Sequence, residues 1–370
     1  MDGRTGIAPH IRDGFSFAYA MRVLVLALVP SLVIGVFNAG FQANVRLAAP
    51  GLSGDLGWRA GLLDALGIGH DPSAMFSALV HGLLYVVPVF IVVFLVAWGF
   101  SALFARMRKT PIGSGVGEDI LVLALLFTML LPATIPLWQA ALGITFAVVM
   151  GREIFGGAGK YFLNPPLTGL AFLYVTYPKE MTVETNWAAV DAFTSPTYLQ
   201  LVGRDDPGTI ASLGTTWMQS FIGLVPGPIG TTSALACVFA AVYLIRRGII
   251  SGRVVTGALI GMIAAALLVN LMSGDGNAYI GISWYWHLVM GSFAFGAVFL
   301  ATDATSSAMT NRGRWIYGLL VGVMVIVIRV GNGHHPDGVM FAILLANIFA
   351  PLIDYGVMWA NIRRRAKRDA

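Results

Sequence analysis

The stretch GLLYVVPVFIVVFLVAWGFSALFA, residues 82–105, contains no charged side chain and forms one continuous apolar run. At 1.5 Å per residue, an α-helix of this length crosses a hydrocarbon core about 30 Å thick. A strand of a membrane barrel would instead be about 10 residues long and would alternate in polarity. The stretch therefore predicts a transmembrane helix.

Similar runs recur along the chain of 370 residues, of which 57% are hydrophobic and 11% are charged. A soluble domain averages about 25% charged residues. We expect an all-α polytopic membrane protein of one domain, residues 1–370, with about ten transmembrane helices in two related five-helix halves and some broken or short helices. The predicted spans are 17–38, 82–105, 119–133, 136–153, 164–178, 230–248, 253–273, 284–303, 313–331 and 337–359.

The charges in the connecting loops predict the orientation of these spans. Ten spans place both termini on one side, together with seventeen Lys and Arg residues. The other side holds four, which are Arg46, Arg59, Lys179 and Arg204. Because cytoplasmic loops are enriched in Lys and Arg, we expect a cytoplasmic N-terminal segment, 1–16, and a basic cytoplasmic tail, 360–370. The tail is interpreted as a topology anchor and not as a nucleic-acid site.

Two sequence features bear on packing. Trp138-x4-Gly143 and Trp286-x4-Gly291 open the fourth and eighth spans, a weak sign that the halves are related. The small-residue motif GALIG, residues 257–261, predicts close helix packing, within the chain or against a partner.

Some kinds of redox site are excluded from this chain. Cys237 is the only cysteine, so the chain alone can form neither an internal disulfide nor an all-cysteine iron–sulfur cluster. The glycine-rich stretch FGGAGKYFLNPPLTG, 155–169, does not match a P-loop, because Tyr161 follows Lys160. We interpret it as a site of tight packing. No catalytic constellation and no metal site are predicted.

Ionisable side chains at membrane depth are costly and often functional. The candidates are Glu118, Asp119, Asp303, Arg329 and Asp354. Glu118 and Asp119 also suit the N-terminus of the third span, where a negative charge stabilises a helix. For each group alone a structural role is equally open. Together, Glu118, Asp303 and Asp354 would lie toward the cytoplasmic side and predict a path for a cation.

The polar stretch DAFTSPT, residues 191–197, lies between the fifth and sixth spans, on the predicted outer side. Local hydrogen bonding of its hydroxyls, with Pro196 fixing the backbone, favours an ordinary turn. The residues themselves do not single out one hydroxyl.

Long segments of the chain resemble one family in order and spacing, the NqrB family of sodium-translocating NADH:quinone oxidoreductases. The resemblance runs from about residue 8 to the C-terminus, and RnfD, from the Rnf complex, is a second relative. It rests on APHIRDGFSFAYAMRVLVLALVPSLVIGVFNAG, PATIPLWQAALGITFAVVMGREIFGGAGKYFLNPPLTGLAFL, ISWYWHLVMGSFAFGAVFLATD and MFAILLANIFAPLIDY.

The resemblance implies two flavins. The family joins FMN by a phosphoester bond to the last Thr of D-G-x-[ST]-G-A-T, which matches Thr197, although Ala192, Ser195 and Pro196 replace the two Gly and the Ala. It holds riboflavin near R-N-F-L-N-P, whose second Asn matches Asn164 and whose first is replaced by Tyr161. Its quinone site corresponds to the region of Glu118. Its sodium path corresponds to Glu118, Asp303 and Asp354.

The resemblance thus implies a membrane component of an NADH:quinone reductase in the bacterial inner membrane. Electrons would pass from covalent FMN via riboflavin to ubiquinone, coupled to Na⁺ translocation. The NADH site would lie on a partner, since this chain has no dinucleotide-binding fingerprint. The implied partners are NqrA, NqrC, NqrD, NqrE and NqrF, a flavin transferase, quinone and membrane lipid, but no nucleic acid. Two alternatives are an RnfD-type component of a ferredoxin:NAD⁺ oxidoreductase and a flavin-free channel or carrier on the same scaffold.

Overall fold

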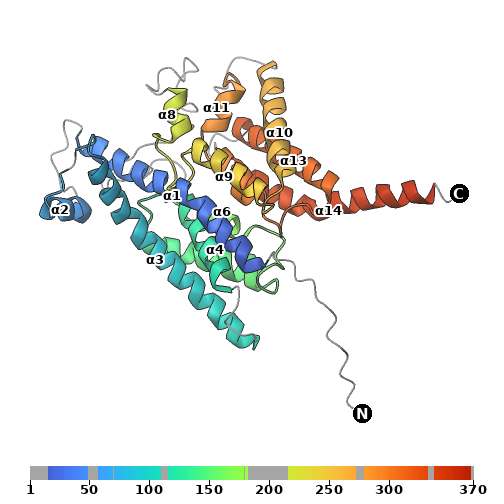
Figure 1. Ribbon diagram of the computed structural model, residues 1–370, viewed down its shortest axis with the longest axis horizontal. Coiled ribbons are helices and arrows are strands. Elements are labelled where there is room, and N and C mark those ends of the chain that lie inside the picture. The colour runs from blue at the N-terminus through green and yellow to red at the C-terminus, as the bar shows by residue number, and fades with distance from the viewer. Residues whose placement is uncertain are drawn as a thin grey trace, which may run out of the picture.

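The computed structural model describes residues 16–48, 57–69, 71–109, 116–178, 180–181, 216–271, 279–331 and 337–367, and within these ranges it contains helices and no strand. Figure 1 shows long helices laid side by side with shorter ones between them. The helices are α1 (Phe17–Leu47), α2 (Gly57–Ala65), α3 (Met75–Met107), α4 (Val116–Leu130), α5 (Leu137–Val148), η1 (Val149–Glu153), α6 (Pro165–Thr176), α8 (Trp217–Ile222), α9 (Ala234–Arg246), α10 (Gly252–Leu271), α11 (Trp284–Val289), α12 (Phe293–Phe295), η4 (Gly296–Leu300), α13 (Asn311–Gly331) and α14 (Val339–Ala366).

Each predicted span coincides with a helix or with a series of short helices. In the described part of the chain, five helices are long and apolar enough to cross a membrane: α1, α3, α10, α13 and α14. The chain is therefore a multi-pass membrane protein. The prediction of short helices in the third and fifth spans is also confirmed, because α4 has 15 residues and α6 has 12, or about 18–23 Å. α14 continues to Ala366, so the helix includes most of the predicted basic tail.

The eighth predicted span is broken. α11 ends at Val289, and Gly291 then adopts a left-handed backbone with φ of 74° before α12 begins. Only glycine adopts this conformation without steric cost, which explains its place at the break. The sequence match to Gly143 does not extend to structure, because Gly143 lies inside α5. The two segments do agree in ending on π-helices, η1 and η4.

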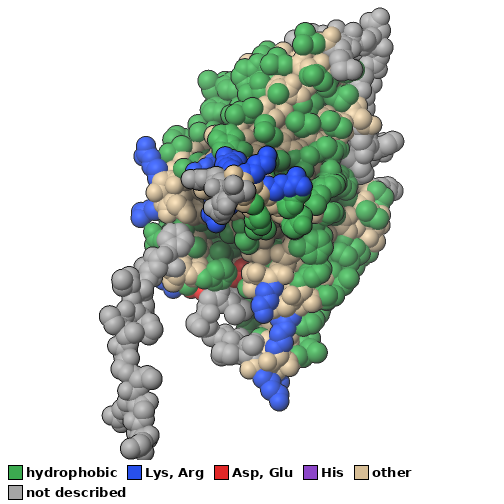
Figure 2. Space-filling model, turned by 90° about the vertical axis from the view of Figure 1, so that its right-hand side faces the viewer, with side chains coloured by type: hydrophobic (Ala, Val, Ile, Leu, Met, Phe, Trp, Pro, Cys, Tyr) green, Lys and Arg blue, Asp and Glu red, His purple; other side chains and the backbone are tan. Residues whose placement is uncertain are grey.

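Polar contacts at each end of the bundle join residues that the predicted order of spans places on the same side of the membrane. At the end predicted to be cytoplasmic, Arg253 of α10 bonds Asn311 of α13 (2.9 Å). At the other end, Asn38 of α1 donates to the carbonyl oxygen of Val225 (2.8 Å), and Trp217 donates to that of Tyr285 (3.1 Å). The surface in Figure 2 is mostly hydrophobic, as lipid contact requires, and its Lys and Arg side chains lie in groups.

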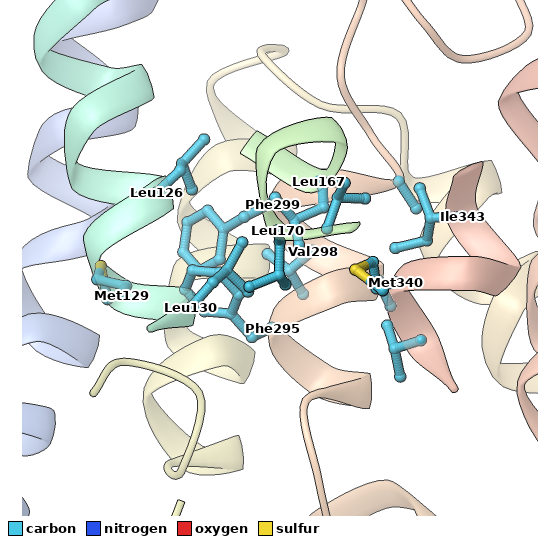
Figure 3. Packing of buried hydrophobic residues seen from close by; sticks show 14 of the residues in the cluster. Leu126, Met129, Leu130, Leu167, Leu170, Phe295, Val298, Phe299, Met340 and Ile343 are labelled. Carbon is cyan, nitrogen blue, oxygen red and sulfur yellow. The ribbon is translucent and has the colours of Figure 1, made fainter. Parts of the chain in front are cut away.

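The buried core lies where helices from both halves of the chain meet. Figure 3 shows Leu126 and Leu130 of α4 and Leu170 of α6 beside Phe299 of η4 and Ile343 of α14. Burial of these side chains joins elements that are far apart in the sequence; even Leu170 and Phe299 are separated by 129 positions. The core therefore fixes the position of η4 relative to α4 and α6, which the site described below requires.

The GALIG motif packs within the chain. A Cβ built at Gly322 of α13 would lie 2.5 Å from the backbone nitrogen of Met262 and 3.0 Å from the carbonyl carbon of Ala258, both in α10. Gly318, one turn earlier, likewise faces Ala258. The two backbones thus touch along rows of small residues, as in other membrane helix pairs.

We expect Gly322→Leu to separate α10 from α13 and to reduce sharply the amount of folded protein recovered from membranes, since the clash is with backbone atoms. Overpacking of this kind typically costs about 1–3 kcal/mol or more. Fluorescence-detected gel filtration of a tagged chain measures the effect. Gly331→Ala is the control in the same helix, because a Cβ there meets no atom within 4 Å. Equal recovery of both variants would contradict the packing argument.

Candidate functional site

A cavity of about 330 Å³ lies among the helix ends that are predicted to be cytoplasmic. Its size is at the lower end of the range of small-molecule sites. Its apolar wall includes Met21, Leu123, Leu126, Ile250 and Phe299. Its polar lining residues are Asp119, Arg152, Tyr161, Asn164, Thr302, Asp303 and Thr305. A mostly apolar cavity with a few polar groups suits a flat organic ligand with polar edges.

Two π-helices bring residues to the cavity wall. η1 carries Arg152, and η4 carries Phe299 and leads directly to Thr302 and Asp303. A π-turn inserts an extra residue into a helix and is frequently found at functional sites. The two π-helices belong to separate halves of the chain, so the cavity lies between the halves.

Asn164 is held at the N-terminus of α6. Its Oδ1 accepts a hydrogen bond from the backbone N–H of Leu167 (3.4 Å), an N-cap, and Pro165 and Pro166 occupy the first helical turn. Its Nδ2 donates to the carbonyl oxygen of Leu300 (3.3 Å). Because an amide has two N–H donors and two lone pairs, one donor and one lone pair remain for a ligand.

Tyr161 and Asp303 both line the cavity and are hydrogen-bonded to each other. The Tyr161 hydroxyl lies 3.3 Å from Asp303 Oδ1, and Asp303 also accepts from Ser306 Oγ (2.9 Å) and from the N–H of Thr305 (3.4 Å). These bonds join the loop before α6 to the loop after η4. Tyr161, Asn164 and Asp303, three of the predicted site residues, therefore come together.

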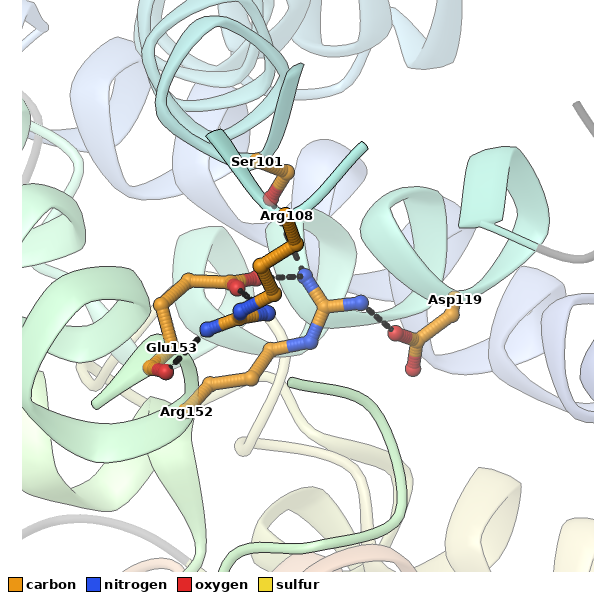
Figure 4. Close-up of polar contacts among 5 residues, drawn as sticks. All are labelled: Ser101, Arg108, Asp119, Arg152 and Glu153. Atoms are coloured by element: carbon orange, nitrogen blue, oxygen red, sulfur yellow. Dashed lines mark hydrogen bonds and ion pairs between the residues drawn. The ribbon is translucent and has the colours of Figure 1, made fainter. Parts of the chain in front are cut away.

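A cluster of four charged side chains lies beside the cavity (Figure 4). The Arg152 guanidinium pairs with Asp119 and with Glu153 (3.1 Å) and donates to Ser101 Oγ (3.0 Å). Arg108 pairs with the second oxygen of Glu153 (2.6 Å). Two positive and two negative groups give no formal net charge, so each buried ion has an opposite partner.

Sequence reasoning missed Arg152 as a site residue, because it was counted among the loop charges. In the structure it is buried, with 2% of its surface exposed. The available signal was the pair Arg152-Glu153 directly after an apolar run, together with Asp119 inside the third predicted span. Charge alone does not reveal which loop-end residues turn inward.

The remaining predicted residues lie elsewhere. Glu118 is in the first turn of α4, pairs with Arg22 (3.1 Å) and does not line the cavity, unlike its neighbour Asp119. Asp354 accepts hydrogen bonds from the backbone N–H groups of Met309 (2.7 Å) and Thr310 (3.0 Å), which fixes the loop before α13. Thr197 lies outside the described residues.

The three carboxylates proposed for a cation path do not form one site. Across the described ranges, no three His, Cys, Asp or Glu side chains come together in a way that could hold a metal ion. Asp303 lines the cavity, whereas Glu118 and Asp354 do not. A cation that uses these carboxylates would therefore bind to them one after another.

Fold and site together define a class: a multi-pass helical membrane protein with a small-molecule cavity between its two halves, bordered by buried charges. Comparison with known sequences then gives the family. The chain belongs to the NQR2, RnfD, RnfE family, whose sequence model matches residues 4–363.

Its curated relatives include the NqrB subunit of the Na(+)-translocating NADH-quinone reductase from several bacteria. The chain is 44% identical to that of Ectopseudomonas mendocina and 45% identical to that of Stutzerimonas stutzeri. It is 42% identical to that of Azotobacter vinelandii. Each match covers 99% of this chain and 90% of the relative.

Proposed function

We propose that this chain is the membrane subunit of a redox-driven Na⁺ pump, in which electrons pass from covalent FMN via riboflavin to ubiquinone. The names of its relatives support a role in a sodium-translocating NADH-quinone reductase rather than in an Rnf complex. In this proposal the chain resides in the bacterial inner membrane with both termini in the cytoplasm. NADH is oxidised on a partner among NqrA, NqrC, NqrD, NqrE and NqrF.

The observation that carries the proposal is the cavity lined by Tyr161, Asn164 and Asp303. Its residues fit riboflavin: Phe299 and Leu126 offer apolar surface to the ring faces, and Asn164 offers a free N–H and a lone pair to the polar edge. Tyr161 could stack on the ring. The flavin would supply the electron-transfer chemistry, while the chain would supply position and electrostatics.

The FMN would be attached by a flavin transferase to Thr197, in the segment between α6 and α8. Positive-inside counting supports an outer position for this segment. The hydroxyl would serve as a tether and not as an acid or base.

Ubiquinone would bind near Glu118, where α1 and α4 are joined by the exposed Arg22–Glu118 pair. Na⁺ would pass Glu118, Asp303 and Asp354, whose oxygens suit a hard cation. The cation would offset the cost of a carboxylate at membrane depth.

We expect Asn164→Asp to weaken riboflavin binding about 10-fold or more while the protein still folds. Aspartate keeps the N-cap of α6, because its oxygen can accept from Leu167 N–H, but it removes the amide donors and adds a negative charge to the cavity that Asp303 also lines. Riboflavin extracted from the purified complex and quantified by chromatography measures the effect.

Thr310→Ser is a suitable control for handling losses, because this residue bonds Asp354 and does not line the cavity. Wild-type complex lacking extractable riboflavin would contradict the proposed function and favour a flavin-free channel or carrier. Wild-type riboflavin content in Asn164→Asp would contradict the role given to Asn164.

A further inference from the structure

Arg152 has a buried hydrogen-bond donor that no described residue satisfies. Its Nη1 donates to Ser101 and Glu153, and its Nη2 pairs with Asp119. Its Nε is buried and has no hydrogen-bond partner in the described part of the chain. Buried polar groups without partners are rare in native proteins, and each calls for a partner such as water, an ion or a ligand.

The position of Arg152 favours a ligand as that partner. Of the described residues with an unsatisfied buried side-chain nitrogen or oxygen, Arg152 is the one that lines the 330 Å³ cavity. Asn164 and Tyr161 line the same cavity. A molecule bound there would meet the Asn164 amide and the Arg152 guanidinium together.

The surrounding charges hold the guanidinium in place. Asp119 and Glu153 come from α4 and η1, and Glu153 is fixed in turn by Arg108, which also donates to the Glu153 carbonyl oxygen (Figure 4). A guanidinium bound on two sides loses little further conformational freedom when a ligand arrives. The pairing with two carboxylates also makes a permanent positive charge tolerable at this depth.

We propose that Arg152 is a flavin-binding residue, which donates from Nε–H to an acceptor on the pyrimidine edge of riboflavin. The inference rests on the proposed function, because it assigns a further contact to the same riboflavin site. The carbonyl oxygens and ring nitrogens of that edge are acceptors, so a charged donor selects this edge over the apolar dimethylbenzene edge.

The contact between Arg152 and the flavin ring also changes the reduction potential of the flavin. When the flavin ring takes up two electrons from an electrode and protons from solvent, electron density on its pyrimidine acceptors increases. A fixed cationic donor then binds the reduced ring more tightly than the oxidised ring, which raises the potential. Loss of Arg152 therefore lowers the reduction potential of the flavin.

The test uses Arg152→Gln combined with Asp119→Asn in the complete complex. The pair removes both buried charges together and leaves Glu153 paired with Arg108, so no carboxylate loses its only partner. We expect riboflavin to bind about 10- to 100-fold more weakly, as for the loss of a hydrogen bond from a charged donor. We also expect a lower midpoint potential in spectroelectrochemical titration of the flavin that remains.

Arg108→Gln is the matched control, because Arg108 contacts the same Glu153 but does not line the cavity. It should keep riboflavin content and potential. If the double variant fails to assemble, the conservative change Arg152→Lys tests the same point, since it keeps the charge but cannot provide Nε–H. It should bind riboflavin more weakly than wild type.

An assembled double variant or Arg152→Lys variant with wild-type affinity and potential overturns the inference and leaves the riboflavin site intact. A wild-type complex without riboflavin overturns the proposed function, and the inference with it. The two failures are thus distinguished by the wild-type flavin content.

Discussion

Replacing Thr197 with alanine is expected to abolish covalent flavin on this chain. Alanine has no hydroxyl oxygen with which to form a phosphoester, so the loss should be complete and not partial. A denaturing gel viewed under ultraviolet light detects the flavin on the unfolded chain, and intact mass measures its addition. Wild type, coexpressed with its own transferase, should give a fluorescent band and one added FMN.

A neighbouring hydroxyl supplies the control for this experiment. Ser195→Ala removes a hydroxyl from the same stretch, DAFTSPT, at a position where the family motif has Gly, and it should keep the flavin. A fluorescent Thr197→Ala band would show that another residue carries it. A dark wild-type band would show that the replacement of Gly-Ala by Ser195-Pro196 prevents attachment.

The second large effect is expected at Arg329, whose side chain is completely buried. It donates to the carbonyl oxygens of His287 (2.9 Å) and Met290 (3.0 Å), which lie at the C-terminal end of α11, where the break begins. It also donates to the carbonyl oxygen of Asp337 (3.1 Å) and pairs with its carboxylate (3.4 Å). One side chain thus satisfies backbone groups that the broken span and the start of α14 leave without helical partners.

Arg329→Met should therefore destabilise the protein by about 3–5 kcal/mol, because three carbonyl oxygens lose a charged donor and each buried group left unsatisfied costs about 1–3 kcal/mol. This is a large share of the usual net stability of a protein. Thermal unfolding followed by light scattering of the purified complex, and the yield of complex, measure the loss. Arg253→Met is the control, because Arg253 bonds Asn311 at an exposed site. An unchanged unfolding temperature for Arg329→Met would contradict this account of the break.

Much of the fold could be predicted from hydrophobicity and loop charge alone, because a helix that crosses the hydrocarbon core needs a long apolar run. The presence of helices in the ten predicted segments, the shortness of α6 and the packing of GALIG are examples. The break at Gly291 could not be predicted, because a glycine in an apolar run is compatible with a continuous helix, as Gly143 shows. Its stabilisation depends on Arg329, which reaches it only in the folded state.

The site was predictable in part. Resemblance to a family singled out Asn164, Tyr161 and Asp303, and the structure places all three around one cavity. Asp354 was chosen for its charge at membrane depth, and the structure adds hydrogen bonds to a loop that its sequence position does not indicate. Arg152 was missed because burial of a charge depends on Asp119 and Ser101, which lie in other helices.

In the proposed function, flavins on this chain carry the electrons that drive sodium transport. The most direct measurement is NADH-driven Na⁺ uptake in proteoliposomes containing the whole complex, with ubiquinone present and a protonophore added. Wild type should accumulate Na⁺, whereas the variant with both Thr197→Ala and Asn164→Asp should neither accumulate Na⁺ nor reduce ubiquinone, although its partner subunit still oxidises NADH with an artificial acceptor. Undiminished Na⁺ uptake and quinone reduction by that variant would contradict the account.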